Sequence, residues 1–262
     1  MLGGERQDFQ LYRYPPSPDL AALVERHWVT RWALPPGVRS SVTLLPHPCV
    51  NLVLDTGRLV VSGIGRERFT RELTGRGGAH GVKFRPGGFY PLLRSRVSEL
   101  TGQILPLEAL WGAEVTRLEE ALNATDDIGQ RVRAVEEFLR RRWPEPDPNV
   151  ELVGRVVQAL LYDRTITRVD DLTRTFGIAT RTMQRLFQRY VGVSPKWVLQ
   201  RYRLHEAAAR LAEGTSGSWA EVAVELGYFD QPHFIRDFTR AVGMTPLEYV
   251  DACTRHEAPV SA

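Results

Sequence analysis

The spacing of apolar residues changes along the chain, and the change separates two regions. Between about residues 20 and 93 the apolar residues form short runs that Pro and Gly separate. The runs VERHWVTRW, CVNLVLD, RLVVSGIG and GVKFRPG alternate with polar residues or are rich in β-branched ones. Both patterns are typical of strands. The sequence therefore predicts a small, barrel-like, β-rich domain in the N-terminal half.

A helical period replaces this pattern after about residue 107. Leu118, Leu122 and Leu139 belong to an apolar series with polar residues between its members, as in amphipathic helices. The segment RRRWPEPDPN, residues 140–149, then contains three prolines, which do not fit inside a helix. We therefore predict an α+β protein with a β-rich domain and its flanking helices over residues 1–142, a linker over 143–149 and an all-α domain over 150–251.

An internal repeat organises the all-α region. Residues 171–195, DLTRTFGIATRTMQRLFQRYVGVSP, align with residues 221–246, EVAVELGYFDQPHFIRDFTRAVGMTP. Pairs such as Phe187/Phe238 share one offset, and the glycine pair Gly177/Gly227 has an offset shorter by one residue. The insertion therefore falls in the turn, where a loop can absorb it. Each copy has the order of a helix-turn-helix unit: a short helix, a turn with Gly and a second helix.

Capping residues and a long helical segment complete this architecture. Thr180 and Asp230 are the candidate N-caps of the two second helices, and Pro232 falls in a first turn, where Pro is tolerated. Between the units, WVLQRYRLHEAAARLAEG, residues 197–214, contains strong helix formers and ends in Gly214. The sequence thus predicts two helix-turn-helix units joined by one long helix.

Helical phase gives each second helix an apolar side and a polar side. Met183, Leu186, Phe187 and Tyr190 would face the core in the first unit, as would Phe234 and Phe238 in the second. Arg pairs well with guanine and Gln with adenine in the major groove. We therefore predict that the outward residues read bases: Arg181, Gln184, Arg185, Gln188, Gln231, His233 and Arg236.

Charge favours the same interpretation. The chain has a net charge of +3 and a pI near 9.0, which permits a nucleic-acid partner without requiring one. Between Leu172 and His205, however, the chain contains seven basic residues and no Asp or Glu, a composition suited to phosphate. The predicted phosphate contacts are Arg174, Arg189, Lys196, Arg201, Arg203 and Arg240. One Arg-rich helix is more often merely solvated, but two units in register favour DNA binding.

Residues 150 to 250 resemble the AraC/XylS-type regulators of bacteria, above all in the stretch GYFDQPHFIRDFTRAVGMTPLEY. In these regulators two helix-turn-helix units are joined by one long helix. The resemblance implies base readers at the positions of Arg181, Gln184 and Arg185, and of Gln231, Pro232, His233 and Arg236. Pro232 departs from the usual small polar residue and has no side-chain donor.

The N-terminal half resembles an uncharacterised β-rich domain that often precedes this DNA-binding unit. The segments WVTRW, LLPHPCVNLVLDTG and VKFRPGGFYPLL carry the resemblance. It implies a cupin-like module for sensing or for oligomerisation.

Together the two resemblances imply a transcription regulator, an activator rather than a repressor, that binds double-stranded operator or promoter DNA. RNA polymerase, a small-molecule effector and a second copy of the chain are the further candidate partners.

Six residues of the β-rich half are candidates for an effector pocket, because aromatic walls with a few polar groups are typical of small-molecule sites. They are Trp28, Trp32, Phe84, Arg85, Phe89 and Tyr90. In the alternative interpretation the aromatic residues belong to the core and Arg85 pairs with a carboxylate.

The residues that could carry other chemistry are few. His27, His47 and His80 lack the HxH or HxxxH spacing of metal ligands, so we expect no metal, no cofactor and no enzymatic activity. Cys49 and Cys253 form no CxxC pair, and no stretch has the length of a signal or of a membrane span. We therefore expect a cytoplasmic protein without a membrane partner. Two alternatives stay open: a DNA-targeted cupin-type metal enzyme, and a DNA binder without an effector.

Overall fold

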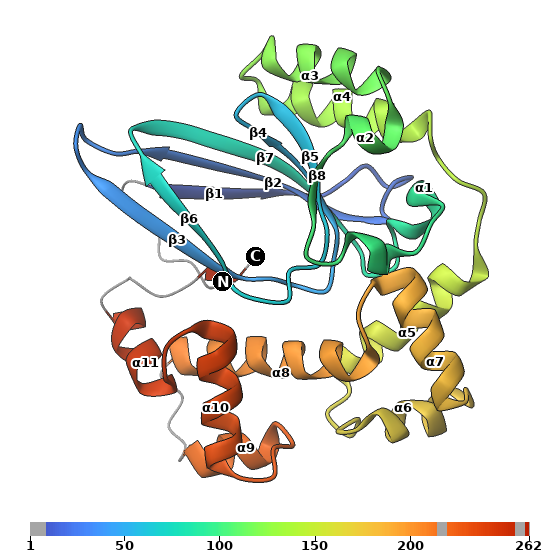
Figure 1. Ribbon diagram of the computed structural model, residues 1–262, viewed down its shortest axis with the longest axis vertical. Coiled ribbons are helices and arrows are strands. Elements are labelled where there is room, and N and C mark those ends of the chain that lie inside the picture. The colour runs from blue at the N-terminus through green and yellow to red at the C-terminus, as the bar shows by residue number, and fades with distance from the viewer. Residues whose placement is uncertain (1–8, 214–218, 255–259, 262) are drawn as a thin grey trace.

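The computed structural model describes residues 9–213, 219–254 and 260–261. A β-rich N-terminal half lies above a helical C-terminal half, and the chain crosses between them along one side (Figure 1). Six strands form one sheet in the order β1-β2-β7-β4-β5-β8. They are β1 (Phe9–Tyr14), β2 (Val24–Ala33), β7 (Arg76–Phe84), β4 (Asn51–Asp55), β5 (Arg58–Ser62) and β8 (Ile104–Pro106).

A second, smaller sheet has the order β6-β3-β9 and consists of β6 (Phe69–Thr74), β3 (Arg39–Leu45) and β9 (Val260–Ser261). All described pairings are antiparallel except that of β3 with β9. The hairpin between β4 and β5 shows how the sequence sets the register. Thr56 and Gly57 both have positive φ, as a two-residue turn between tightly paired strands requires.

Short helices flank the large sheet. They are α1 (Tyr90–Leu93), the 3-10 helix η1 (Val97–Leu100), α2 (Glu108–Trp111), α3 (Glu114–Asn123) and α4 (Ile128–Arg140). The last two bury Leu118, Leu122 and Leu139, as the helical spacing of these residues predicts. Asp127 caps α4 by accepting a hydrogen bond from the backbone N–H of Gln130.

In the C-terminal half all described elements up to Thr254 are helices. After the non-helical segment 141–147 come α5 (Pro148–Tyr162), α6 (Val169–Phe176), α7 (Thr180–Leu186) with its π-helical extension η2 (Phe187–Val191), α8 (Pro195–Ala212), α9 (Trp219–Glu225), α10 (Gln231–Val242) and α11 (Pro246–Thr254). The predicted long helix is α8, whose 18 residues correspond to about 27 Å. Gly214, predicted as its end, lies outside the described residues. The α+β architecture with two helix-turn-helix units is confirmed.

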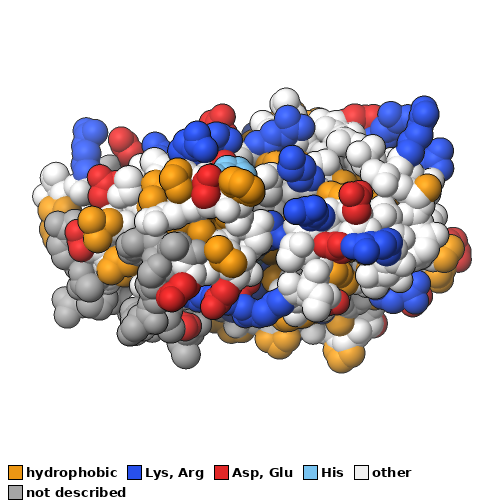
Figure 2. Space-filling view, turned by 90° about the horizontal axis from the view of Figure 1, so that it is seen from below, with side chains coloured by type: hydrophobic (Ala, Val, Ile, Leu, Met, Phe, Trp, Pro, Cys, Tyr) orange, Lys and Arg blue, Asp and Glu red, His pale blue; other side chains and the backbone are white. Residues whose placement is uncertain are grey.

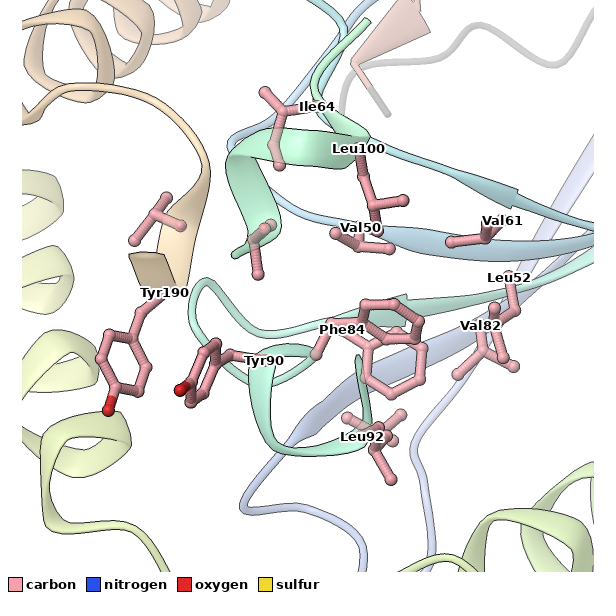
Figure 3. Packing of buried hydrophobic residues seen from close by; sticks show 14 of the residues in the cluster. Val50, Leu52, Val61, Ile64, Val82, Phe84, Tyr90, Leu92, Leu100 and Tyr190 are labelled. Carbon is pink, nitrogen blue, oxygen red and sulfur yellow. The ribbon is translucent and has the colours of Figure 1, made fainter. Parts of the chain in front are cut away.

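The hydrophobic core does not stop at the border between the halves. One cluster extends from Val82 and Phe84 of the sheet to Met183 and Phe187 of the first helix-turn-helix unit. Tyr90 and Tyr190 meet within it, with ring centroids 4.1 Å apart (Figure 3). A second cluster holds α8 to α11 together and includes Leu45 of β3. The first unit is therefore packed directly on the N-terminal half.

Candidate nucleic-acid interface

Local signals at the turns position the two second helices, α7 and α10. Gly177 and Gly243 adopt positive φ at helix ends, where Gly costs least. Asp230 caps α10, because its Oδ1 accepts the backbone N–H of His233 at 2.7 Å, as predicted. The prediction for Thr180 is wrong: α7 already begins at this residue, and the N-cap position is Ala179, which makes no side-chain cap.

The predicted division of α7 and α10 into two faces is confirmed. Met183, Phe187, Phe234 and Phe238 are fully buried. Arg181, Gln184, Arg185, Gln188 and Arg236 are exposed, and Gln231 and His233 are partly exposed. The buried residues therefore hold the helices in place while the polar residues point away from the core.

The outer face of α10 carries a negative charge that α7 lacks. Oδ2 of Asp237 lies 3.5 Å from Nε2 of His233, and its Oδ1 lies 3.4 Å from Nη1 of Arg240. The Nε of Arg236 donates to the carbonyl of Pro232 at 3.3 Å. The face of α10 is consequently less positive than that of α7, whose charged residues are Arg alone.

Helix α8 separates the two candidate readers. In Figure 1, α7 lies near one end of α8 and α10 near the other. Figure 2 shows the molecule from below, and Lys and Arg side chains are prominent on the half of this face that carries α5 to α7. The exposed basic residues of the acid-free segment lie on α6, α7, η2 and the first turn of α8.

The predicted phosphate contacts fall into two groups. Arg174, Arg189, Lys196 and Arg240 are exposed. Arg174 forms an ion pair with Asp171 at 2.5 Å, and the Nε of Arg189 donates to the hydroxyl of Tyr90 at 2.6 Å. These four side chains can reach a ligand outside the protein.

The predicted phosphate contacts of Arg201 and Arg203 do not agree with their positions in the structure. Arg201 is only 4% exposed; its Nη2 donates to the carbonyl of Arg66 at 2.7 Å, so it cannot contact a phosphate in this structure. Arg203 is partly buried and donates to the carbonyl of Thr167. Arg201 is buried because α8 packs against the N-terminal half. Its helical phase signals this, since Val198 and Leu204 lie three residues before and after it.

The N-terminal half contains a cavity of about 590 Å³ between the two sheets, and Trp28 and Trp32 line it as predicted. The other four candidates for an effector pocket do not line it. Phe84 and Phe89 are fully buried against each other, with ring centroids 4.9 Å apart, and Tyr90 contacts Arg189.

Strand alternation explains the failure for Phe84, because its neighbour Lys83 faces the cavity and Phe84 must then face the opposite side. The Nε of Arg85 donates to the carbonyl of Ala21 at 2.7 Å. Phe84, Phe89 and Tyr90 are core residues, and Arg85 is bonded to a carbonyl rather than to a carboxylate.

The three histidines of the N-terminal half lie at two places. His27 and His80 are neighbours, with ring centroids 5.7 Å apart, and Nε2 of His27 lies 3.3 Å from Oε1 of Glu136. His47 instead stacks on His205 of α8 at 3.9 Å. Among the residues that the structure describes, no three His, Cys, Asp or Glu side chains are placed to hold a metal ion. The helices of the same residues include none that is long and apolar enough to cross a membrane.

Comparison with known proteins divides the chain in a similar way. Residues 172–252 match a family described as a helix-turn-helix domain, and residues 12–106 match a domain of unknown function, DUF6597. The chain is 32% identical over 80 residues to the HTH-type transcriptional regulator ExsA of Pseudomonas aeruginosa, covering 30% of this chain and 28% of that protein. It is 35% identical over 97 residues to the transcriptional activator NphR of a Rhodococcus species, covering 37% and 28%. The chain thus spans less than a third of the length of these relatives.

The solved structures that a structural comparison finds include ToxT from Vibrio cholerae, with a TM-score of 0.42 and 11% identity over 95% of this chain and 99% of that chain. The C-terminal domain of AraT, a response regulator from Geobacillus stearothermophilus, has a TM-score of 0.37 and 22% identity over 41% and 88%.

The C-terminal half is therefore a double helix-turn-helix domain. It is of the AraC type, its relatives are AraC-family transcription regulators, and a DUF6597 domain precedes it.

Proposed function

We propose that this protein is a sequence-specific, DNA-binding transcription regulator that reads two adjacent segments of the major groove. Residues 150–251 form the reading domain, residues 143–149 the linker, and residues 1–142 a domain that senses an effector. The observation that carries the proposal is a pair of polar helix faces, one on α7 and one on α10, which lie near opposite ends of α8. Buried Phe187 and Phe238 hold these faces outward.

The length of α8 fits this role. Two recognition helices enter the same side of a duplex when they are about 34 Å apart, one helical turn of DNA. A helix of 18 residues is about 27 Å long, which is close to this spacing. One chain can therefore present a tandem pair of readers to one face of the duplex.

Each predicted residue has a distinct part in this function. Arg181, Gln184, Arg185 and Gln188 read bases in the first groove segment, and Gln231, His233 and Arg236 read the second. Arg174, Lys196 and Arg240 contact phosphates, and Arg189 does so once its hydrogen bond to Tyr90 opens. Phosphate contacts fix the register of the protein on DNA but carry no sequence information.

The experiment that tests the proposal selects bound sequences from a random duplex pool. We expect a two-part site whose centres lie about one helical turn apart. Arg185→Ala should then lower affinity for the selected site by about 1–3 kcal/mol and relax the preference at one base pair.

The matched control is Arg155→Ala, which removes an exposed arginine from α5 rather than from a recognition helix; the side chain of Arg155 is 64% exposed. It should leave the preference intact. An equal loss for Arg185→Ala on selected and random DNA would contradict base reading by Arg185.

Several related proteins carry the word activator in their names, among them RhaR of Mannheimia succiniciproducens and VirF of Yersinia enterocolitica. By analogy we propose activation, with RNA polymerase and a second copy of the chain as further partners. Since operator DNA in bacteria lies in the cytoplasm, we propose that location for the protein.

A further inference from the structure

The two helix-turn-helix units close their first helices with the same backbone hydrogen bond. In the first unit the N–H of Ile178 donates to the carbonyl of Thr173 at 3.2 Å, and in the second unit the N–H of Tyr228 donates to the carbonyl of Ala223 at 2.8 Å. The spacing of donor and acceptor is the same in both units, as at a helix end that a glycine terminates. Ile178 and Tyr228 are therefore equivalent positions.

The second unit contains one additional residue after this point. The N-cap of α7, Ala179, follows Ile178 directly, whereas Phe229 separates Tyr228 from the N-cap of α10, Asp230. Both N-cap carbonyls then accept a hydrogen bond from the backbone N–H four residues later, so the two units are in register again. The residue inserted in the second turn is therefore Phe229.

The side chain of the inserted residue does not pack into the core. Phe229 is 91% exposed, the largest value among the exposed large apolar residues of the described chain. An apolar residue directly before an N-cap commonly packs on the fourth residue of the helix, which here is Phe234. Phe234 is fully buried, and the rings of Tyr228 and Phe238 lie next to it, with centroids 5.4 and 5.7 Å away. The Phe229 ring instead points into solvent, where a ligand can reach it.

The position of this ring is at the end of α10 that reads DNA. In a helix-turn-helix unit the first residues of the second helix contact the base edges. Phe229 comes just before that helix, and Pro232, in its first turn, is also exposed. The turn itself is packed on α8, because Gly227 lies so close to Arg203 that a Cβ there would stand 2.9 Å from Nη2. The inserted ring therefore extends the reading surface of α10 from a fixed turn.

The chemistry of this end favours a base edge over the DNA backbone. Phosphates are bound by cations and by hydrogen-bond donors, and neither Phe229 nor Pro232 has a side-chain donor. Asp230 lies between them in the chain with a carboxylate, which accepts the backbone N–H of His233. Among the base edges in the major groove, thymine alone presents a methyl group, and apolar side chains recognise it.

We propose that Phe229, together with Pro232 three residues later, recognises a thymine in the second groove segment by contact with its C5-methyl group. This inference rests on the proposed function, since it assigns a further specificity-determining residue to the same DNA-binding surface. The two units then read DNA in different ways. Helix α7 uses hydrogen bonds from Arg and Gln, and the end of α10 adds an apolar contact.

The test replaces single thymines of the selected DNA site by deoxyuridine, which removes the methyl group and keeps every hydrogen-bonding group of the base. We expect one replacement, or two at neighbouring thymines, to lower affinity about fourfold, the effect of exposing one aliphatic carbon. Fluorescence anisotropy measures the affinities. Unchanged affinity after every replacement, or a selected site without thymine, would overturn the proposal.

Variants assign the methyl contact to Phe229. In Phe229→Ala the difference in affinity between the thymine and deoxyuridine sites should disappear, whereas Phe229→Leu, which keeps an apolar side chain, should retain most of it. The matched control is Tyr162→Ala, which removes an aromatic side chain, 72% exposed, from the end of α5; the difference should keep its parent value. A difference that persists in Phe229→Ala would overturn the assignment.

Folding and function are checked separately. Because the Phe229 ring is almost fully exposed, Phe229→Ala should have the thermal denaturation midpoint of the parent protein, and the deoxyuridine series on the parent protein needs no variant at all. A random pool that yields no site contradicts the proposed function and this inference with it. A selected site whose affinity depends on no thymine methyl group contradicts this inference alone.

Discussion

The Nε of Arg189, in the first recognition unit, donates a hydrogen bond of 2.6 Å to the hydroxyl of Tyr90, at the start of α1 in the N-terminal half. The guanidinium also lies over the Tyr90 ring, 5.0 Å from its centroid. An arginine predicted to contact phosphate is thus held by the domain that precedes the DNA-binding domain. The contact joins the two halves at the surface, above the core that they share.

Removing the Tyr90 hydroxyl should release Arg189 toward DNA. We expect Tyr90→Phe, which keeps the ring, to steepen the slope of log affinity against log salt by about 0.9, the value for one additional phosphate contact. Filter binding at several salt concentrations measures it. Tyr190→Phe is the control, because the Tyr190 hydroxyl bonds to Asp147 instead. Identical slopes for Tyr90→Phe and the parent protein would show that Arg189 does not gain a phosphate contact.

Substitutions at two adjacent residues of α7 should affect the stability of the protein and its affinity for DNA separately. Met183 is fully buried and Gln184 is exposed. We expect Met183→Ala to lower the free energy of unfolding by about 2–5 kcal/mol, whereas Gln184→Ala should change it by less than about 0.5 kcal/mol. Urea denaturation measures both. Gln184→Ala should instead reduce affinity for the selected DNA site, and unaltered affinity would argue against its role in base reading.

Capping should matter in only one of the two units. We expect Asp230→Ala to destabilise the protein by about 1 kcal/mol, because the backbone N–H of His233 loses its acceptor. Thr180→Ala makes the matched control, since no side chain caps α7. Thermal denaturation of both variants compares them, and equal losses of stability would contradict the assignment.

The buried histidines should make the fold sensitive to acid. Burial lowers the pKa of His80 and of His205 to about 3, below the value of about 6.5 in an unfolded chain. Between these values the unfolded state binds more protons than the folded state, so stability is complete above pH 6.5 and falls as the pH decreases. Each histidine contributes up to about 1.4 kcal/mol per pH unit. Denaturation series from pH 7 to pH 5 measure the slope, and a free energy of unfolding that is constant over this interval would exclude the effect.

The sequence predicted most of the helical half because its signals are local. Helical phase separated Met183 and Phe187 from Arg181 and Arg185, and the same spacing works wherever one side of a helix faces a core. Asp230 was recognised as a cap from its position alone. Thr180 was predicted as a cap on the same ground, and the prediction was wrong because the helix begins one residue earlier than the pattern indicates.

The candidate pocket was predicted less well. Trp28 and Trp32 line the cavity, whereas Phe84, Phe89 and Tyr90 belong to the core and Arg85 bonds to a carbonyl. Aromatic composition does not tell which side of a strand faces a cavity and which faces a core. That depends on the layer that covers each side.

The amino-acid sequence by itself determined the repeated helix-turn-helix unit, its apolar and polar faces and the α8 segment between the copies, since each depends on residues within a few turns of one another. Only the tertiary structure decided that Arg201 is buried, that Arg189 is held by Tyr90 and that His47 stacks on His205. These contacts join residues about a hundred or more positions apart, and they form because the two halves share one core.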